Sequence, residues 1–409
     1  MNKNYKELVV GLDIGTAKVT CLVAEVKPDG RLDVVGLGTQ PASGLKRGVV
    51  VNIEATVDAI SRVVQEVELM AECKIHEVYT GIAGSHIKSF NSNGSWAIKE
   101  KEVSALDVER VIEVARAMPI PAEQQILHTL TQEFIIDGQG GVREPIGMSG
   151  VRLEVKVHIV TGAVSAAQNV IKCVRRCGLE VLDLSLQPLA SSHAVLTEDE
   201  KELGVCMIDI GGGTTDIAVF TQGAIRHTAV IPVAGDQITN DIAMALRTPT
   251  AEAEEIKIRH GVAMHQLADP EDMIEVPGVG DRPPRKLSCQ ALADVIEPRV
   301  SELFELVQAE LRRSGYEELL SSGVVLTGGS AVMRGMVELG EEVFHMPVRI
   351  GAPQYDGGLA DVVCQPRYAT AMGLVMEGMT QRRRGLQTRE VRSVRQVFGR
   401  MKAWFERNF

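Results

Sequence analysis

The sequence predicts an α/β fold made of two similar halves, and three observations support this prediction. An apolar strand delivers Asp13 to the turn DIGT, and a second apolar strand leads away from it. The same arrangement recurs at Asp209, which is followed by a turn of three glycines and two threonines. After each strand pair comes a further turn and then a third strand. A repeated three-strand unit indicates a duplicated domain.

The two turns have the composition of an anion site. Glycine permits positive φ values and close approach of the backbone to a ligand, and consecutive backbone N–H groups form an anion-binding concavity. An aspartate beside a bound anion requires a cation between them, and Mg²⁺ with a phosphate chain fits because this ion takes few carboxylates. A lone triple-glycine turn is more often a plain hairpin turn, but the second copy favours two phosphate turns that face one another across a cleft.

Composition limits the class of protein. A chain of 409 residues is too long for one hydrophobic core and indicates about two to four domains. The sequence starts without a signal-peptide core, and no apolar run approaches the ~18 residues of a membrane span. The seven cysteines show no metal-ligand spacing. These features favour a protein of the reducing cytoplasm.

Charge is distributed unevenly along the chain. The formal net charge is −11, yet residues 380–409 contain nine Lys or Arg and two Glu. The remainder is therefore strongly acidic, which argues against a nucleic-acid-binding groove, and we expect no nucleic-acid partner. A basic end on an acidic body indicates a localised function for that end.

The basic end predicts a tether followed by a membrane-binding helix. Residues 379–393 have little apolar content and no periodicity, as in a flexible linker. In residues 394–409, aromatic and apolar side chains form one helical stripe and basic side chains occupy the rest, which is typical of a helix lying in a membrane surface. The alternative is a helix docked on the protein's own core. The stripe comprises Val394, Val397, Phe398, Met401, Trp404, Phe405 and Phe409.

Two further segments interrupt the repeated units. Residues 85–162 contain a capping box at Ser104 and an alternating strand, 151–160, whose polar face with His158 is expected to meet solvent. Residues 235–286 contain Glu254 and Lys257, three apart on an expected helix, a spacing that most often gives a solvated pair.

A third glycine turn follows later in the chain. Residues 324–326 form a buried strand that leads to Thr327-Gly-Gly-Ser330 and then to a helix. Small residues at a helix N-terminus suit an anion or the flat face of a base. A strand, a glycine turn and a helix in succession are common in α/β proteins, so this turn alone is weak evidence of a binding site. Three such turns in this order are strong evidence.

Together these motifs carry a resemblance to known proteins. DIGTAK, DIGGGTTD and LTGGSA resemble the two phosphate motifs and the adenosine motif of the actin, Hsp70 and sugar-kinase superfamily. Within it, nearly the whole chain is similar to the FtsA family of bacterial cell-division proteins, through GLDIGTAKV, ELGVCMIDIGGGTTDIAVF, IKIRHG, VIEPR and VLTGG. The resemblance implies an actin-like duplicated ATPase fold of two lobes with mixed sheets and flanking helices, an inserted small α+β subdomain and a C-terminal amphipathic helix.

The resemblance also implies a domain organisation. The first lobe carries the first phosphate motif, and the second lobe carries the second phosphate motif and the adenosine motif. Each lobe has one insertion, and that of the second lobe is expected to bind a partner peptide. The expected boundaries are 1–84 and 163–202 for the first lobe, 85–162 for its family-specific insertion, 203–234 and 287–378 for the second lobe, 235–286 for its insertion, 379–393 for the linker and 394–409 for the amphipathic helix.

ATP with Mg²⁺ is the cofactor that the resemblance implies. Asp13 and Asp209 would hold Mg²⁺ largely through water, and Glu254 with Lys257 would contact the ribose or the adenine. No residue is identified that positions an attacking water, so ATP hydrolysis is left undecided. The implied cofactor-binding residues are Asp13, Gly15, Thr16, Ala17, Lys18, Asp209, Gly211, Gly212, Gly213, Thr214, Thr215, Glu254, Lys257, Gly328, Gly329 and Ser330.

The implied function is that of a membrane adaptor in cell division. Such a protein would polymerise with itself at the division septum, on the cytoplasmic face of the inner membrane. Residues 235–286 would bind the C-terminal peptide of the tubulin-like protein FtsZ, residues 394–409 would hold FtsZ filaments at the anionic membrane surface, and residues 85–162 would contact other membrane proteins of the divisome.

Three alternatives come from the same superfamily. A small-molecule kinase of the sugar-kinase type needs a general base, and no aspartate is singled out for that role. An Hsp70-like chaperone needs a further substrate-binding β-domain. A pilus-assembly actin homologue is closer in size, but the amphipathic tail favours division.

Overall fold

The computed structural model describes residues 7–280 and 282–383. Two five-stranded sheets form its centre, in the strand orders β11-β6-β1-β2-β3 and β14-β13-β12-β17-β18. In both sheets the first three strands of the unit are antiparallel, and two later strands extend the sheet in parallel from the first. This repetition confirms the predicted duplicated α/β fold. The sheets consist of β1 (Leu8–Ile14), β2 (Lys18–Val26), β3 (Leu32–Pro41), β6 (Glu77–Ile82) and β11 (Glu180–Leu186), and of β12 (Val205–Ile210), β13 (Thr215–Thr221), β14 (Ala224–Ile231), β17 (Val324–Thr327) and β18 (Val348–Ile350).

Helices cover the two sheets and join them. The apolar faces of α1 and α3 pack on the first sheet, and those of α6, α8 and α9 pack on the second. A third apolar cluster, which includes Leu22, Met207 and Leu374, lies between the sheets and joins the lobes. The helices are α1 (Ile53–Met70), α3 (Val164–Arg176), α4 (Gln187–Val195), α5 (Glu198–Leu203), α6 (Gly235–Leu246), α7 (Thr250–His260), α8 (Cys289–Ser314), α9 (Met336–Phe344), α10 (Ala360–Val363) and residues 369–383. Short elements are β4 (Leu45–Lys46), β5 (Val49–Val50) and the 3₁₀ turns His265–Leu267, Glu317–Leu319 and Pro366–Tyr368.

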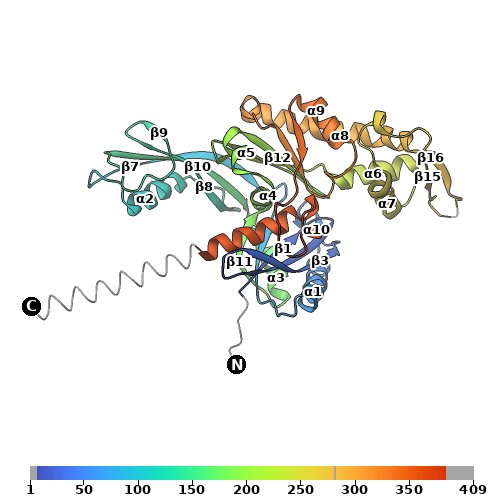
Figure 1. Cartoon of the computed structure of the whole chain (residues 1–409), viewed down its shortest axis with the longest axis horizontal. Helices are drawn as coiled ribbons and strands as arrows, with labels where there is room; N and C mark the ends of the chain where they lie inside the picture. The colour runs from blue at the N-terminus through green and yellow to red at the C-terminus, as the bar shows by residue number, and fades with distance from the viewer. Residues whose placement is uncertain (1–6, 281, 384–409) are drawn as a thin grey trace, which may run out of the picture.

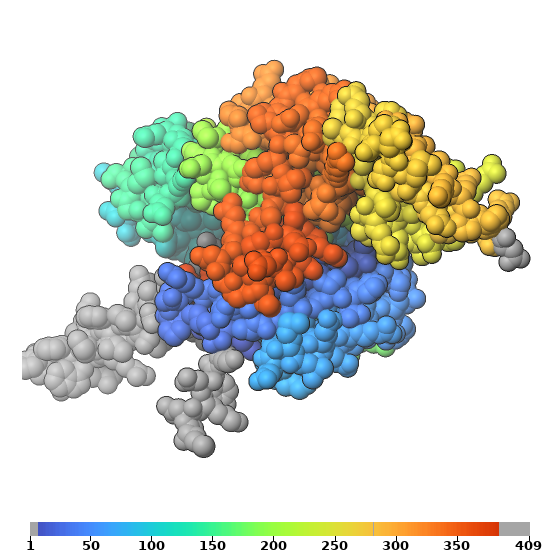
Figure 2. Space-filling model, turned by 45° about the vertical axis from the view of Figure 1, so that its right-hand side comes forward, coloured from blue at the N-terminus to red at the C-terminus, as the bar shows by residue number. Residues whose placement is uncertain are grey.

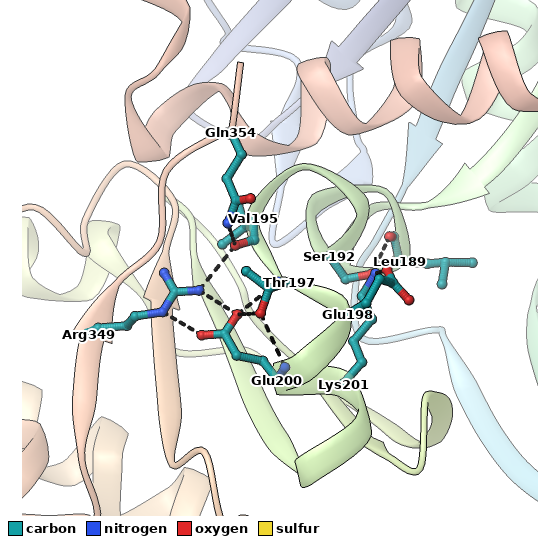
Figure 3. A network of polar contacts seen from close by, with 9 residues as sticks. All are labelled: Leu189, Ser192, Val195, Thr197, Glu198, Glu200, Lys201, Arg349 and Gln354. Atoms are coloured by element: carbon teal, nitrogen blue, oxygen red, sulfur yellow. Dashed lines mark hydrogen bonds and ion pairs between the residues drawn. The ribbon is translucent and has the colours of Figure 1, made fainter. Parts of the chain in front are cut away.

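The connector between the lobes, α4 and α5, is fastened to the second sheet (Figure 3). The Glu200 carboxylate accepts a hydrogen bond from the backbone N–H of Thr197 at 2.9 Å and so caps α5. The same carboxylate accepts two bonds from the guanidinium of Arg349 in β18, at 2.7 and 2.8 Å. Because a bidentate pair of this kind fixes orientation as well as distance, the connector has one defined position on β18.

The first insertion forms a separate four-stranded sheet in the order β7-β10-β8-β9. Helix α2, which begins at the predicted Ser104 capping box, packs on one face of it. The second insertion ends in a two-stranded ribbon, and the two insertions lie at opposite ends of the long axis (Figure 1). The first insertion consists of β7 (Lys88–Ala97), α2 (Ala105–Arg116), β8 (Gln124–Ile136), β9 (Gln139–Val142) and β10 (Arg152–Ala163), and the ribbon of β15 (Met273–Val276) and β16 (Arg285–Ser288).

The first insertion also contacts the second lobe, which the sequence did not predict. His158 in β10 was expected on a solvent face, but its side chain is 1% exposed. Its Nε2 lies 3.0 Å from Thr228 Oγ1 in β14, and its Nδ1 lies 2.8 Å from Asn91 Oδ1. Gln132 adds a bond to the carbonyl of Ile225 at 2.9 Å. Part of the polar face of this sheet is therefore an internal interface with edge strand β14, while Arg152 and Lys156 on the same face are exposed to solvent as predicted.

The first five residues of the predicted linker, 379–383, are helical and continue the helix that starts at 369. Gln381 donates to Asp183 at 2.6 Å, and Arg382 donates to the carbonyl of Leu8 at 2.8 Å. Because these contacts are polar, the sequence of this helical end shows no apolar periodicity. Figure 2 shows the C-terminal part of the described chain, orange to red, against the blue N-terminal part. The rest of the predicted linker and the predicted amphipathic helix, 394–409, lie outside the described residues.

The described residues include no helix with the length and apolar character that a membrane span requires.

We predict that protonation of His158 weakens the fold. Burial lowers the pKa of this imidazole to about 4 from its ordinary 6.5. The unfolded chain then binds the proton more readily, so the stability that neutral His158 provides is complete above pH 6.5 and is lost as the pH falls toward 4. The loss amounts to at most about 3 kcal/mol. Thermal unfolding followed by circular dichroism at pH 7 and pH 5 measures it.

His158→Gln keeps hydrogen-bonding capacity but cannot be protonated, so its melting temperature should fall less between the two pH values than that of the unaltered protein. His76→Gln, at an exposed histidine, serves as the control and should retain the original pH dependence. An unchanged pH dependence in His158→Gln would show that this histidine is not part of the effect.

Candidate functional site

A cavity of about 1070 Å³ lies between the lobes. Its walls come from the β1–β2 turn, the β12–β13 turn, helices α6 and α7, and the turn after β17. The structure therefore brings together three motifs that are far apart in the sequence. The predicted site residues that line the cavity are Asp13, Gly15, Thr16, Ala17, Lys18, Asp209, Gly211, Gly212, Gly213, Thr214, Glu254, Lys257, Gly328, Gly329 and Ser330.

The two phosphate-type turns touch one another. Both are closed by the same bond, from Gly15 N–H to the carbonyl of Lys18 at 2.9 Å and from Gly211 N–H to that of Thr214 at 3.0 Å. A Cβ atom on Gly213 would lie 2.7 Å from the hydroxyl oxygen of Thr16. Since real Cβ atoms do not approach other atoms so closely, only glycine allows this contact between the lobes.

Three carboxyl groups gather where the turns meet. Asp13 ends β1 and accepts a bond from Gln187 Nε2 at 3.0 Å. Asp209 ends β12 and accepts a bond from Ser191 Oγ at 2.7 Å. Asp216, opposite Asp209 in the β12–β13 pair, accepts a bond from Thr214 Oγ1 at 3.1 Å through Oδ2. Its Oδ1 is buried and has no hydrogen-bond partner among the described residues.

Burial makes these acids reluctant to ionise. It raises the pKa of Asp13 to about 6, although nearby Lys18 lowers it and Asp209 raises it. Burial, assisted by the charge of Asp209, raises the pKa of Asp216 to about 8. The pKa of Asp209 is also raised by burial. Like charges held close together in a low-dielectric site disfavour joint ionisation, so the cluster favours a cation.

Lys18 is the basic side chain at the cluster. Its ammonium group donates to the carbonyl of Arg367 and lies 4.6 Å from the ring centre of Tyr368. Burial lowers the pKa of this lysine to about 8, while Asp13 acts in the opposite direction. A lysine held between carboxylates and a cavity is suited to bind an anion there.

Glu254 and Lys257 form part of a hydrogen-bonded network in which the Lys257 side chain is buried, while that of Glu254 is 43% exposed. The ammonium group of Lys257 is bonded to the Glu254 carboxylate at 2.6 Å, to Thr239 Oγ1 at 2.8 Å and to the carbonyl of Gly235 at 3.1 Å. Gly235 begins α6, and its N–H donates to the carbonyl of Gly211 in the second turn, at 3.1 Å. The second insertion is therefore hydrogen-bonded to that turn.

The third turn lies close to the second. Gly328 has a φ of +90°, and a Cβ there would lie 2.5 Å from Asp209 Oδ1. Ser330 Oγ donates to the carbonyl of Gly211 at 3.0 Å. Gly329 also lines the cavity, and a Cβ there would meet only the side chain of Arg367, at 4.0 Å. The room beside this glycine suits close approach of a ligand to the backbone.

Thr215 differs from the prediction. Its side chain is fully buried and its hydroxyl donates to the carbonyl of Val233 at 2.8 Å. It does not line the cavity. Side chains alternate along a strand, so Thr214 and Asp216 face the cavity while Thr215 points away.

Several cavity residues were missed by sequence reasoning. Asp216 is the last residue of the DIGGGTTD motif, and the alternation of side chains along a strand would have placed it at the cavity. Gln187, Asp236, Arg367 and Thr370 also line the cavity. They lie beyond the glycine motifs and carry no local pattern of their own.

Family models match two parts of the chain. The model described as "Cell division protein FtsA" matches residues 206–373. The model described as "SHS2 domain inserted in FTSA" matches residues 84–161, which include most of the sheet that docks on β14.

Solved structures are similar in fold. The PilM-PilN type IV pilus biogenesis complex aligns with a TM-score of 0.67 at 18% identity, covering 91% of this chain and 98% of that one. MreB5 of Spiroplasma citri bound to ADP aligns with a TM-score of 0.52 at 16% identity, covering 94% and 98%. These likenesses confirm the expected actin-like fold.

Relatives are similar over nearly the whole length. "Cell division protein FtsA" of Pseudomonas aeruginosa is 61% identical, covering 98% of both chains. That of Neisseria meningitidis serogroup B is 53% identical, covering 97% of this chain and 98% of the relative. That of Escherichia coli K12 is 46% identical, covering 99% of both. The chain therefore belongs to the FtsA family of cell-division proteins.

Proposed function

We propose that this protein binds ATP with Mg²⁺, polymerises on the cytoplasmic face of the inner membrane at the division septum, and anchors FtsZ filaments there through residues 394–409. The observation that carries the nucleotide part is the contact between the two glycine turns around buried carboxylates. The cavity volume, about 1070 Å³, is at the upper end of ligand pockets, which span about 300–1,000 Å³.

The residues present fit Mg²⁺ and a phosphate chain. The Oδ1 atom of Asp216 is buried without a partner among the described residues, and the pKa of Asp13 is raised by burial. The water shell of a hydrated dication would donate hydrogen bonds to Asp216 Oδ1, and its charge would stabilise the ionised form of Asp13. Asp13 and Asp209 would hold the ion largely through water, with Asp216 accepting from its water shell.

The phosphates and the nucleoside have separate partners in this proposal. Backbone N–H groups of the two turns, with Lys18, would hold the phosphates. The Glu254–Lys257 pair would contact the ribose or the adenine, and Gly328, Gly329 and Ser330 would line the adenine pocket. Bound ATP would then contact both lobes and stabilise one relative position of them.

Membrane attachment is proposed from the tail. Each basic residue near an anionic leaflet contributes ~1 kcal/mol, and each large apolar side chain contributes at most ~1.5–3 kcal/mol. Ordering of the segment offsets part of this, so one tail would bind reversibly. Several tails held in one filament would bind far more firmly through effective concentration.

Partner surfaces are assigned to the two insertions. Residues 235–286 expose Met244 of α6 and Met273 of β15, at 78% and 52%, outside the cavity. Exposed apolar side chains of this kind suit the FtsZ C-terminal peptide. Residues 85–162 expose Ile146 and Val151, at 61% and 69%, and would contact other divisome membrane proteins.

A pilus-assembly role is the second candidate, because the fold aligns with PilM at a TM-score of 0.67. That likeness, at 18% identity, concerns the fold alone. The 61% identity to a cell-division relative supports division instead.

A matched pair of threonine substitutions tests the nucleotide site. Thr214→Val removes the hydroxyl of a residue that lines the cavity and, in this proposal, contacts a bound phosphate, so ATP affinity should fall roughly 10–100-fold, the range for a hydrogen bond to a charged group. Thr215→Val removes a hydroxyl that faces Val233, so it should lower the melting temperature and change ATP affinity by less than about twofold. Isothermal titration with ATP and Mg²⁺ measures both. Equal losses of affinity would contradict the assignment.

A liposome experiment tests the adaptor role. Purified FtsZ filaments are sedimented with anionic liposomes, ATP and this protein. Trp404→Glu with Phe405→Glu places charge on the predicted apolar stripe, and FtsZ in the pellet should fall at least about tenfold because the apolar burial is lost.

The control adds the same charge elsewhere on the same segment. Gln396→Glu with Ala403→Glu lies opposite the stripe, at 100° per residue, and should reduce FtsZ in the pellet by less than about threefold. Similar behaviour of the two variants would favour the docked-helix alternative and refute membrane insertion of this stripe.

A further inference from the structure

Three side chains of metal-binding type meet on the wall of the cavity, away from the carboxylates of the two turns. They are His260, the last residue of α7, Asp272, which directly precedes β15, and Cys289, the first residue of α8. One ligand atom from each lies within 4.8 Å of the other two. All three line the cavity. Three separate segments thus contribute to one cluster.

The backbone holds two of these residues in place. The N–H of Cys289 donates to the carbonyl of Asp272 at 2.9 Å. The next pair inward, Met273 and Ser288, begins the β15–β16 ribbon. As a result the Cys289 Sγ lies 3.3 Å from Asp272 Oδ2. Cys289 is 4% exposed, so its position is also fixed by packing.

The chemistry of the set favours a soft divalent cation. Imidazole, carboxylate and thiolate are the ligands of zinc, with bonds of about 2.0–2.3 Å, and tetrahedral ligands at those bond lengths lie about 3.3–3.8 Å apart. The Cys289–Asp272 separation of 3.3 Å already matches, and a small rotation of His260 would close the rest. A thiolate ligand selects against Mg²⁺, so this cluster differs in kind from the one at Asp13 and Asp209.

We propose that His260, Asp272 and Cys289 form a binding site for a zinc-class divalent cation. Three protein ligands leave a fourth position for water or for a donor atom of a molecule in the cavity. The ion would link the end of α7 to the junction of the ribbon and α8, and would so fix the second insertion against its own lobe. The inference is independent of ATP binding.

Asp269 also lines the cavity, so its carboxylate adds negative charge near the cluster and favours a bound cation.

Cobalt(II) is the probe for the test, because a cobalt–thiolate bond gives an intense charge-transfer absorption band. Titration of the intact protein with Co²⁺ should produce this band at one equivalent, and Zn²⁺ should abolish it by displacement. Cys289→Ser should lose the band. His260→Gln and Asp272→Asn should weaken Co²⁺ binding at least about tenfold.

Matched controls separate this site from other thiols and imidazoles. Cys177→Ser, at the end of α3, and His265→Gln, whose imidazole pairs with Asp294 at 2.7 Å, should bind Co²⁺ like the unaltered protein. No band in the unaltered protein, or a band that persists in Cys289→Ser, would refute the proposal. Should Cys289→Ser fail to fold, His260→Gln and Asp272→Asn decide the question, because unchanged Co²⁺ affinity in both refutes it equally.

Discussion

The burial of three carboxyl groups at the contact between two hairpin turns is the constraint on which the rest of this structure depends. A carboxylate removed from water is costly unless it is paired. Here Lys18 is the basic partner that affects the pKa of Asp13, and Asp216 keeps one oxygen without a partner among the described residues. The glycines that let the turns approach one another therefore bring buried carboxyl groups together, and a bound cation would offset their charge. The contact between the two turns thus forms part of the candidate site and part of the interface between the lobes.

The helix formed by residues 369–383 begins beside this cluster and continues along the first lobe. The carbonyl of Arg367 accepts from Lys18, and Thr370 lies 3.4 Å from the carboxylate of Asp209. The helical residues 369–383 then run along the N-terminal strands (Figure 1), and Arg382 bonds to the carbonyl of Leu8. One continuous helix thus runs from the acidic cluster to residue 383, the last described residue.

The sequence was most informative where a pattern is local. Repeated turns, a capping box at Ser104 and strand periodicity predicted the duplicated fold and two glycine turns facing one another, while the full set of expected site residues came from the family resemblance. Three findings depend on contacts between distant segments and left no such pattern: His158 faces β14 rather than water, residues 379–383 are helical through polar contacts, and Cys289 meets His260 and Asp272 although the cysteine spacing suggested no metal site. Thr215 is a case of the opposite kind. The alternation of side chains along its strand was visible in the sequence and would have placed its side chain away from the cavity.

Helix α6 connects the cavity to the surface proposed for a partner peptide on the second insertion. Lys257 of α7 bonds to the carbonyl of Gly235, which begins α6, and the N–H of Gly235 bonds to Gly211 of the second turn. Met244 of the same helix is exposed on the surface proposed for the peptide. A shift of α6 that a bound nucleotide favours would therefore alter the affinity for the peptide, and thermodynamic reciprocity would require the peptide to alter nucleotide affinity by the same factor.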